Sequence, residues 1–348
     1  GRFDVSVAST ERGPYLIVHV SALASRQADI LQLADEILLH TRYDDTAAIA
    51  KLHRQRKDDW ERSAKTRGGR FANVRAQMNL SEKRRLEELF DGISQLRHLQ
   101  GERFGDLREL AHKIFTRDRL LLSATDNLPE AFIDQTLALL PSRPLTRGHA
   151  PASASAPVSE GYVADGNVGY TAFVGKAPAD RPFGGAWNVA ARIVSLDYLW
   201  QEVRVKGGAY GGGLTVEPDG TVDFSSWRDP NPARSLATFG AAGRALARFV
   251  EAGNSFEKYQ VSALAKTEPA RSPRDEVRTL RCLYFDGRTA DDLRRQRREI
   301  LATSPADLTA FARTLTALST NASTCVFAKR ALLERCKLAT VRQISPQK

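Results

Sequence analysis

An arginine and a tyrosine at fixed spacing are the residues of this sequence whose side chains are most suited to binding or catalysis. Arg204 and Tyr210 lie in the segment 199–213 (LWQEVRVKGGAYGGG), where five glycines surround the tyrosine. Glycine is used where the backbone takes a positive φ or where another chain comes close. The pattern therefore suggests a phenol held against a bound polypeptide backbone. A structural alternative stays open, because glycine commonly ends helices and the segment also fits a helix followed by a flexible hairpin.

The glycines of this segment do not predict a nucleotide site. A phosphate-binding loop or a dinucleotide fingerprint has a strand before its glycines and a helix after them, whereas here a helix precedes and a strand follows. The six histidines include no pair at i, i+4 and no H-E-x-x-H or H-x-x-E-H motif, so no set of zinc ligands is apparent. No G-x-S-x-G or Cys/His arrangement stands out either. The sequence therefore reveals no self-contained catalytic centre.

Composition limits the class of protein. The chain of 348 residues is 42% hydrophobic and 26% charged, as in globular proteins. No apolar run approaches the roughly 18–20 residues of a membrane span, and the first residues lack the pattern of a signal peptide. The three cysteines, Cys282, Cys325 and Cys336, have no metal-ligand spacing. We therefore expect a protein that is not secreted, in a reducing compartment and away from membranes.

The net charge of +10 raises the question of nucleic-acid binding. Acidic residues interrupt the basic runs at 54–62 and 292–299, as they do on a solvated helix face. No RNP, zinc-finger or helix-turn-helix pattern accompanies the charge. Nucleic acid is therefore not an expected partner, and a basic nucleic-acid-binding protein is kept as a remote alternative. A salt-dependent shift with nucleic acid would support that alternative.

The first part of the chain combines three strands with a series of helices. The patterns predict strands at 3–8, 15–20 and 119–124, and helices at 28–39, 47–64, 70–78, 83–100, 107–114 and 128–140. The residues Asp44, Asp45 and Thr46 form a helix N-cap cluster. A stretch rich in Pro, Ala and Ser follows at 141–160 and lacks the apolar residues to order itself. We therefore predict domains at 1–145 and 161–348, separated by a flexible linker or loop at 146–160.

The second part positions the arginine and the tyrosine. The patterns predict strands within 161–174, a helix at 183–203, a hairpin of strands 210–216 and 221–227, helices at 232–252, 255–265, 273–284, 290–302 and 305–318, and a strand at 322–328. Asp219 and Gly220 mark the hairpin turn. Asp229 or Asn231 is expected to cap the next helix, with Pro232 in its first turn. Both parts therefore predict an α+β fold in which a mostly antiparallel sheet packs against helices.

Three segments resemble the C-terminal half of the presequence-protease subfamily of the pitrilysin/insulinase (inverzincin) zinc metallopeptidases. The strongest is 199–211, which resembles the helix-to-strand element of that family's last domain. Segment 224–230 (FSSWRDP) is similar to an aromatic-Arg-Asp-Pro element, and segment 68–76 to part of the penultimate domain. The resemblance implies that 1–145 and 161–348 are two homologous-type domains of a half-bowl with the LuxS/metallohydrolase-like fold.

In that family two bowl-shaped halves close around a peptide, and the N-terminal half carries the zinc motif with its glutamate base. The resemblance implies that Arg204 and Tyr210 are the catalytic arginine and tyrosine of the other half. A guanidinium and a phenol are both donors able to stabilise the oxyanion that forms at the zinc site. The resemblance further implies that Gly207, Gly208 and Ala209 bind the substrate. Zinc is expected in the N-terminal half and not in this chain.

The resemblance therefore implies a zinc-dependent metalloendopeptidase that degrades short unstructured peptides, such as cleaved targeting presequences, in a closed chamber. Its partners would be the zinc-bearing N-terminal half and peptide substrates, and this chain alone would be inactive. The implied location is the cytoplasm or an organelle matrix of mitochondrial or plastid type. The alternative is a non-catalytic scaffold subunit of the same superfamily. The presence of Arg204 and Tyr210 argues against that alternative, because a scaffold has no use for them.

Overall fold

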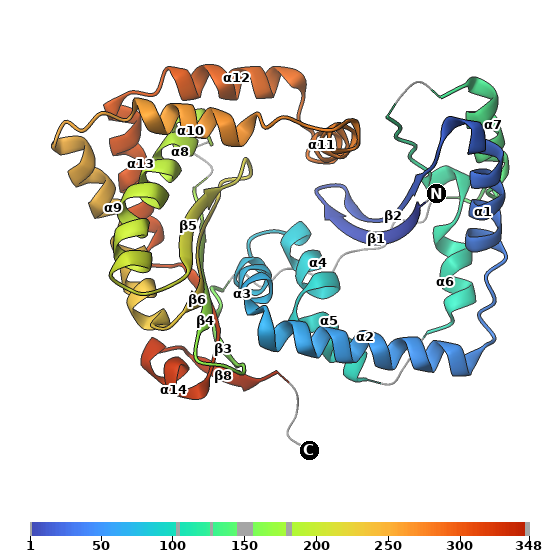
Figure 1. Ribbon diagram of the computed structural model, residues 1–348, viewed down its shortest axis with the longest axis horizontal. Helices are drawn as coiled ribbons and strands as arrows, with labels where there is room; N and C mark the ends of the chain where they lie inside the picture. The colour runs from blue at the N-terminus through green and yellow to red at the C-terminus, as the bar shows by residue number, and fades with distance from the viewer. Residues whose placement is uncertain (1, 102–104, 126–127, 145–155, 179–182, 345–348) are drawn as a thin grey trace. The chain divides into compact units, whose positions relative to one another are not determined.

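The computed structural model of the protein describes residues 2–101, 105–125, 128–144, 156–178 and 183–344. The chain forms two compact units, each assembled from segments that are distant in sequence. Unit 1 comprises residues 1–57, 97–152 and 271–288, and unit 2 comprises residues 58–96, 153–270 and 289–348. Both units combine strands with helices (Figure 1). The predicted α+β class is therefore confirmed.

The two units do not follow the predicted division of the chain. Residues 58–96 belong to unit 2 although they precede the predicted linker, and residues 271–288 belong to unit 1 although they follow it. Most of the predicted linker at 146–160 lies outside the described residues. The assignment of 1–145 and 161–348 to two family domains therefore stays a prediction.

Unit 1 is built around one hairpin. Strands β1 (Arg2–Thr10) and β2 (Gly13–Ser21) pair antiparallel along their whole length. Its other elements are η1 (Ala24–Arg26), α1 (Gln27–Leu39), the first part of α2 (Thr46–Thr66), α6 (Leu107–Ile114), η2 (Arg117–Arg119), α7 (Glu130–Ala138) and α11 (Pro273–Phe285). The hairpin contacts α11 through Tyr15 and Phe285, whose ring centroids are 4.3 Å apart. The predicted N-cap cluster is confirmed at Asp45, whose carboxylate accepts the Ala48 N–H.

Unit 2 contains a six-stranded mixed sheet with the strand order β5-β6-β4-β7-β3-β8. Its strands are β3 (Ser159–Val163), β4 (Gly169–Lys176), β5 (Gly211–Val216), β6 (Thr221–Asp229), β7 (Ser323–Ala328) and β8 (Thr340–Gln343). The four strands from β5 to β7 are antiparallel, whereas β3 runs parallel to both of its neighbours. The predicted hairpin is confirmed as β5–β6. Gly220 adopts φ +85° in its turn, which a glycine accommodates without strain.

Helices cover both faces of this sheet (Figure 1). The helices of unit 2 are the second part of α2, α3 (Gly68–Gln77), α4 (Glu82–Asp91), the first part of α5 (Ile93–Gln100), α8 (Gly185–Ile193), η3 (Val194–Val205), α9 (Pro232–Glu251), α10 (Glu257–Thr267), α12 (Ala290–Leu301), α13 (Pro305–Leu318), α14 (Arg330–Leu333) and η4 (Glu334–Cys336). On one face, Phe239 of α9 stacks on Phe224 of β6 at 5.4 Å between ring centroids. On the other face, Phe71 of α3 lies 6.1 Å from Phe327 of β7.

Two predicted elements are wrong. Residues 119–124 form no strand: η2 ends at Arg119, and residues 120–124 pair with no strand among the described residues. The helix predicted at 83–100 is broken at Gly92, where the backbone is extended. A side chain at Gly92 would occupy the space of the buried Glu88 carboxylate. That carboxylate accepts the Ser94 N–H at 3.1 Å, so the break gives it a partner inside the unit.

Candidate functional site

A π-helical segment carries Arg204. Helix α8 continues into η3, which the sequence predicted as a single α-helix ending near residue 203. The Lys206 N–H donates to the Gln201 carbonyl five residues earlier, at 2.9 Å. This wider turn is rare, and in known proteins it is frequent at functional sites. The Gly208 N–H donates to the Arg204 carbonyl at 3.0 Å and closes the helix one turn before β5.

The glycines of the turn have structural reasons of their own. A side chain at Gly207 would meet the carbonyl oxygens of Val203 and Glu202. Gly208 adopts φ +76°, a left-handed conformation typical of helix ends. The side chain of Ala209 is buried in the core. The local fold thus accounts for these three residues, and their predicted contact with substrate stays a prediction.

The structure brings the predicted Arg204 and Tyr210 together on an exposed face. Tyr210 is 61% exposed, and the guanidinium carbon of Arg204 lies 5.7 Å from the centroid of its ring. The same carbon lies 4.3 Å from the Trp200 ring. The guanidinium of Arg228 is also 5.7 Å from the Tyr210 ring. All of these distances are within the range of cation–π attraction, and we call Trp200, Arg204, Tyr210 and Arg228 the Arg–aromatic cluster.

The carboxylate closest in sequence to Arg204 has other partners. Glu202 binds Lys206 at 2.5 Å and Arg234 at 3.3 Å. The hydrogen bond from Lys206 is the main cause that lowers the pKa of Glu202 below its ordinary value. Within the described part of the chain, neither Arg204 nor Arg228 forms an ion pair. Their guanidinium donors are therefore available to an external oxygen.

Arg228 was not predicted as a member of the site. It lies in β6 at a β-bulge: Gly169 of β4 pairs with Asp229 and Tyr170 pairs with Trp227, so Arg228 is left without a partner residue on β4. Its carbonyl accepts the Tyr210 N–H at 3.3 Å. The sequence signal that could have suggested it is the similarity of segment 224–230 to a family element, although a strand-end arginine alone does not predict a bulge.

The elements after the bulge confirm one predicted helix start. Asn231 occupies the N-cap of α9 without a side-chain hydrogen bond, and Pro232 lies in the first turn. Asp229 is buried and binds the Asn231 N–H at 2.8 Å and the Ser226 hydroxyl at 2.7 Å. The carboxylate of Asp229 therefore fixes the chain directly after Arg228.

The Arg–aromatic cluster can bind an oxygen, but none of its four residues is a carboxylate, an imidazole or a thiol that could act as a general base or a metal ligand. A guanidinium has five N–H donors, and a phenol both donates and accepts. Among the described residues, no group of three or more His, Cys, Asp or Glu side chains is placed to hold a metal ion. The chemistry that this arrangement supports is hydrogen bonding and charge stabilisation at a carbonyl or carboxylate oxygen.

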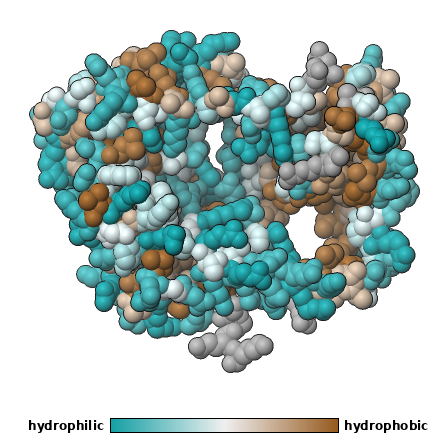
Figure 2. Space-filling view, viewed as in Figure 1, coloured by the Kyte–Doolittle hydropathy of each residue, from teal (hydrophilic) through white to brown (hydrophobic). Residues whose placement is uncertain are grey.

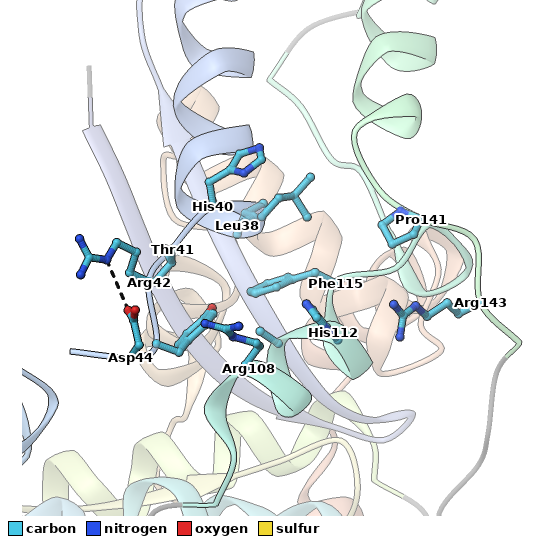
Figure 3. Close-up of a pocket in the computed structure, with 13 residues that line it drawn as sticks. Leu38, His40, Thr41, Arg42, Asp44, Arg108, His112, Phe115, Pro141 and Arg143 are labelled. Atoms are coloured by element: carbon cyan, nitrogen blue, oxygen red, sulfur yellow. Dashed lines mark hydrogen bonds and ion pairs between the residues drawn. The ribbon is translucent and has the colours of Figure 1, made fainter. Parts of the chain in front are cut away.

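Unit 1 contains a separate basic hollow that the sequence did not predict (Figure 3). It has a volume of about 430 Å³ and is lined by Leu38, Leu39, His40, Thr41, Arg42, Tyr43, Asp44, Arg108, Ala111, His112, Phe115, Pro141 and Arg143. Arg42 binds Asp44 at 3.3 Å. A backbone hydrogen bond lowers the pKa of Asp44, and Arg42 and Arg108 lower it further. The lining residues come from three distant segments with no shared motif, so no sequence signal points to the hollow.

Comparison with known proteins assigns the family. A model of the PreP C-terminal domain matches residues 176–328, and a model of a region associated with the M16 peptidases of subfamily C matches residues 4–101. The chain corresponds to the C-terminal half of a peptidase M16 family protein. The resemblance identified from segments 199–211, 224–230 and 68–76 is therefore confirmed.

Curated relatives of this peptidase M16 chain are longer than the chain itself. It is 25% identical to the protein HypA of Clostridium perfringens, over 87% of this chain and 33% of HypA. It is 27% identical to the mitochondrial presequence protease of Eremothecium gossypii, over 84% of this chain and 32% of that protein. The chain thus spans about a third of the length of these relatives.

A solved structure supports the fold. The peptidase M16 inactive domain from Pseudomonas fluorescens superposes with a TM-score of 0.61 and 17% sequence identity, covering 94% of this chain and 81% of that one. In the described residues, no helix combines the length and the apolar character that crossing a membrane requires.

Proposed function

We propose that this chain supplies Arg204 and Tyr210 to the active site of a zinc-dependent oligopeptidase whose zinc is bound by an N-terminal half. Zinc in that half would activate a water molecule and polarise the scissile carbonyl of a peptide. The part of this chain is to bind the carbonyl oxygen as it gains negative charge. The substrates we propose are short unstructured peptides, cleaved targeting presequences among them.

The observation that carries this proposal is the exposed pairing of Arg204 with Tyr210. The two side chains lie within cation–π distance of each other, both are exposed, and Arg204 has no carboxylate partner within the described chain. A guanidinium supplies charge and a phenol supplies an O–H donor, so the pair suits an oxyanion better than a neutral ligand. A scaffold subunit would gain nothing from an unpaired arginine beside an exposed tyrosine.

The backbone beside the pair also suits a peptide. Strand β5 is at the edge of the six-stranded sheet, with β6 on one side and no strand on the other among the described residues. An extended peptide can add to such an edge through main-chain hydrogen bonds. We propose that Gly207, Gly208 and Ala209 present their backbone to the substrate as it enters this edge.

Substitution at the pair tests the proposal in the complete zinc enzyme. We expect Arg204→Ala and Tyr210→Phe each to lower kcat by about 10²–10³, the usual loss when one oxyanion donor is removed. Lys206→Ala is the matched control, because it removes an exposed cation two residues after Arg204 whose partner is Glu202. If Arg204→Ala and Lys206→Ala had equal activity, the chain would be a scaffold subunit and the catalytic proposal would be wrong.

Dependence on the N-terminal half is tested separately. We expect this chain alone to cleave no peptide, and the zinc-bearing half to restore chelator-sensitive cleavage when joined or added. Chelator-sensitive cleavage by the purified chain without a partner would contradict the proposal. The location we propose is the cytoplasm or an organelle matrix, and fractionation of the source cells would check it.

A further inference from the structure

We propose that Arg228 is a positioning residue, which holds Tyr210 in place for the reaction and acts through it. This inference rests on the function proposed for Arg204 and Tyr210.

The backbone of Arg228 is strained. It adopts φ +49°, and Lys337 at φ +52° is the other non-glycine residue with a positive φ among the described residues. A left-handed residue that is not glycine persists only where its surroundings hold it, and such residues cluster at functional sites. Here the surroundings are the β-bulge against β4 and the buried Asp229, which the Ser226 hydroxyl and the Asn231 N–H fix in place.

The bulge connects Arg228 directly to Tyr210. The Arg228 carbonyl accepts the Tyr210 N–H at 3.3 Å, which sets the position of the tyrosine backbone where β5 begins. Next to this bond, Gly211 lies against the Trp227 ring so closely that a side chain would overlap the indole. β-Bulges re-aim side chains next to active sites, and in this sheet the bulge directs Arg228 toward Tyr210.

Neither the backbone conformation nor an ion pair accounts for an arginine side chain at position 228. Glycine would adopt φ +49° without strain, and the Arg228 guanidinium is exposed with no ion pair in the described chain. Within the described part of the chain, the Arg228 guanidinium contacts the Tyr210 ring at 5.7 Å, the same distance as for Arg204. Two guanidinium groups on one ring restrict its rotamers and keep the exposed phenol beside Arg204. The contact between the Arg228 guanidinium and the Tyr210 ring therefore offsets the backbone strain at Arg228.

The test uses Arg228→Gly in the complete zinc enzyme, with Lys337→Gly as the matched control. Both substitutions remove a cation and relieve a positive φ, but only the first lies beside Tyr210. We expect Arg228→Gly to lower kcat roughly tenfold, as loss of a cation–π contact to the reacting side chain would, with KM nearly unchanged. The thermal midpoint should be equal or higher in both variants, because strain is relieved in both.

A double-mutant cycle separates positioning from a structural role. In a Tyr210→Ala background, Arg228→Gly should cause no further loss of kcat, because the ring on which it acts is absent. Arg228→Lys should recover part of the activity, since it keeps the charge but not the planar guanidinium. Equal kcat for Arg228→Gly and Lys337→Gly, a lowered thermal midpoint, or full additivity with Tyr210→Ala would overturn the inference.

The outcome also distinguishes this inference from the proposed function. If Arg204→Ala and Tyr210→Phe retain full activity, the proposed function fails and takes this inference with it. If those two variants lose activity while Arg228→Gly does not, the proposed function stands and the positioning role of Arg228 is wrong.

Discussion

The two units of this chain both combine strands with helices, but they differ in how many apolar side chains they bury. In unit 2, both faces of the sheet are covered, and a continuous core joins its strands to α8, α9 and α13. In unit 1, the buried apolar residues among those described are Ala111, Leu140 and Phe285. Its hairpin leaves Val5 48% exposed, and Figure 2 shows hydrophobic side chains at the molecular surface.

This difference has a consequence for function. Sites on rigid elements hold their geometry better than sites on loosely packed ones. The Arg–aromatic cluster lies on η3, β5 and β6 of the well-packed unit 2. The basic hollow around Phe115 lies in unit 1, where fewer buried contacts hold its walls. We therefore expect catalytic precision from unit 2 and adaptability from unit 1.

The largest expected effect is at a buried ionic network in unit 2. Arg75 of α3 binds Glu160 of β3 at 2.8 Å and Glu88 of α4 at 3.3 Å. Burial raises the pKa of Glu88 above its ordinary value, although Arg75 and Ser94 oppose that rise. We expect Arg75→Ala to lower the free energy of unfolding by about 3–5 kcal/mol, because it removes the arginine that pairs with the buried Glu88 carboxylate. Urea unfolding measures the loss.

The matched control for Arg75 is on the same helix. Arg70 binds Asp91 at 2.8 Å, but its side chain is 60% exposed. Exposed pairs of this kind contribute about 0–1 kcal/mol, so Arg70→Ala should change stability little. If the two variants lost equal stability, burial would not be what distinguishes the core of unit 2.

The second expected effect is a pH dependence at Asp223, in the same unit. Burial raises the pKa of Asp223 to about 6, against hydrogen bonds from Asn73 and Gln77. A carboxyl with a raised folded pKa stabilises the fold most at low pH, and this contribution is lost as the pH rises from about 4 to about 6. The full loss is about 3 kcal/mol. Asp223→Asn should remove this fall, which urea midpoints at pH 4 and pH 7 would measure.

A neighbouring carboxyl gives the control with the opposite sign. Burial raises the pKa of Asp219, but hydrogen bonds from Thr221 and the nearby Arg84 and Lys176 outweigh it, so the pKa is lowered overall. Such a group stabilises the fold above its unfolded pKa and loses that contribution as the pH falls. Asp219→Asn should therefore reduce stability at pH 7, where Asp223→Asn increases it. The same sign for both variants would contradict the assignment.

The third expected effect compares the two units as a whole. Local opening is easiest where few apolar contacts are buried. We expect amides of β1 and β2 in unit 1 to exchange with solvent at least roughly tenfold faster than amides of β4 and β6 in unit 2. Hydrogen exchange followed by mass spectrometry resolves the strands. Equal protection of the two hairpins would mean that the exposed apolar residues of unit 1 do not weaken it.

Much of the fold was predictable because its signals are local. Periodic apolar residues predicted nearly all the helices, and the turn at Asp219 and Gly220 predicted the β5–β6 hairpin. The break at Gly92 and the absence of a strand at 119–124 were not predictable. The first depends on the buried Glu88 carboxylate and the second on a missing pairing partner, and both are properties of the tertiary structure.

The candidate site was predictable only in part, for the same reason. The spacing of Arg204 and Tyr210 around a helix end is local, and the structure places the two side chains together. Arg228 reaches the cluster through a bulge between β4 and β6, and these strands are distant in sequence. Their register could not be read from the chain, so the third cation of the site was missed.

The smallest expected effect is at exposed ion pairs, one in each unit. Lys113 binds Glu109 at 2.6 Å in unit 1, and Lys206 binds Glu202 at 2.5 Å in unit 2. Both are i, i+4 pairs on helices, whose contribution is about 0.3–0.5 kcal/mol. Lys113→Ala and Lys206→Ala should therefore change the urea midpoint equally little, because water screens both pairs whatever lies beneath them. If either variant lost more than about 1 kcal/mol of unfolding free energy, the two units would differ in the stability of their surface ion pairs as well as in the packing of their cores.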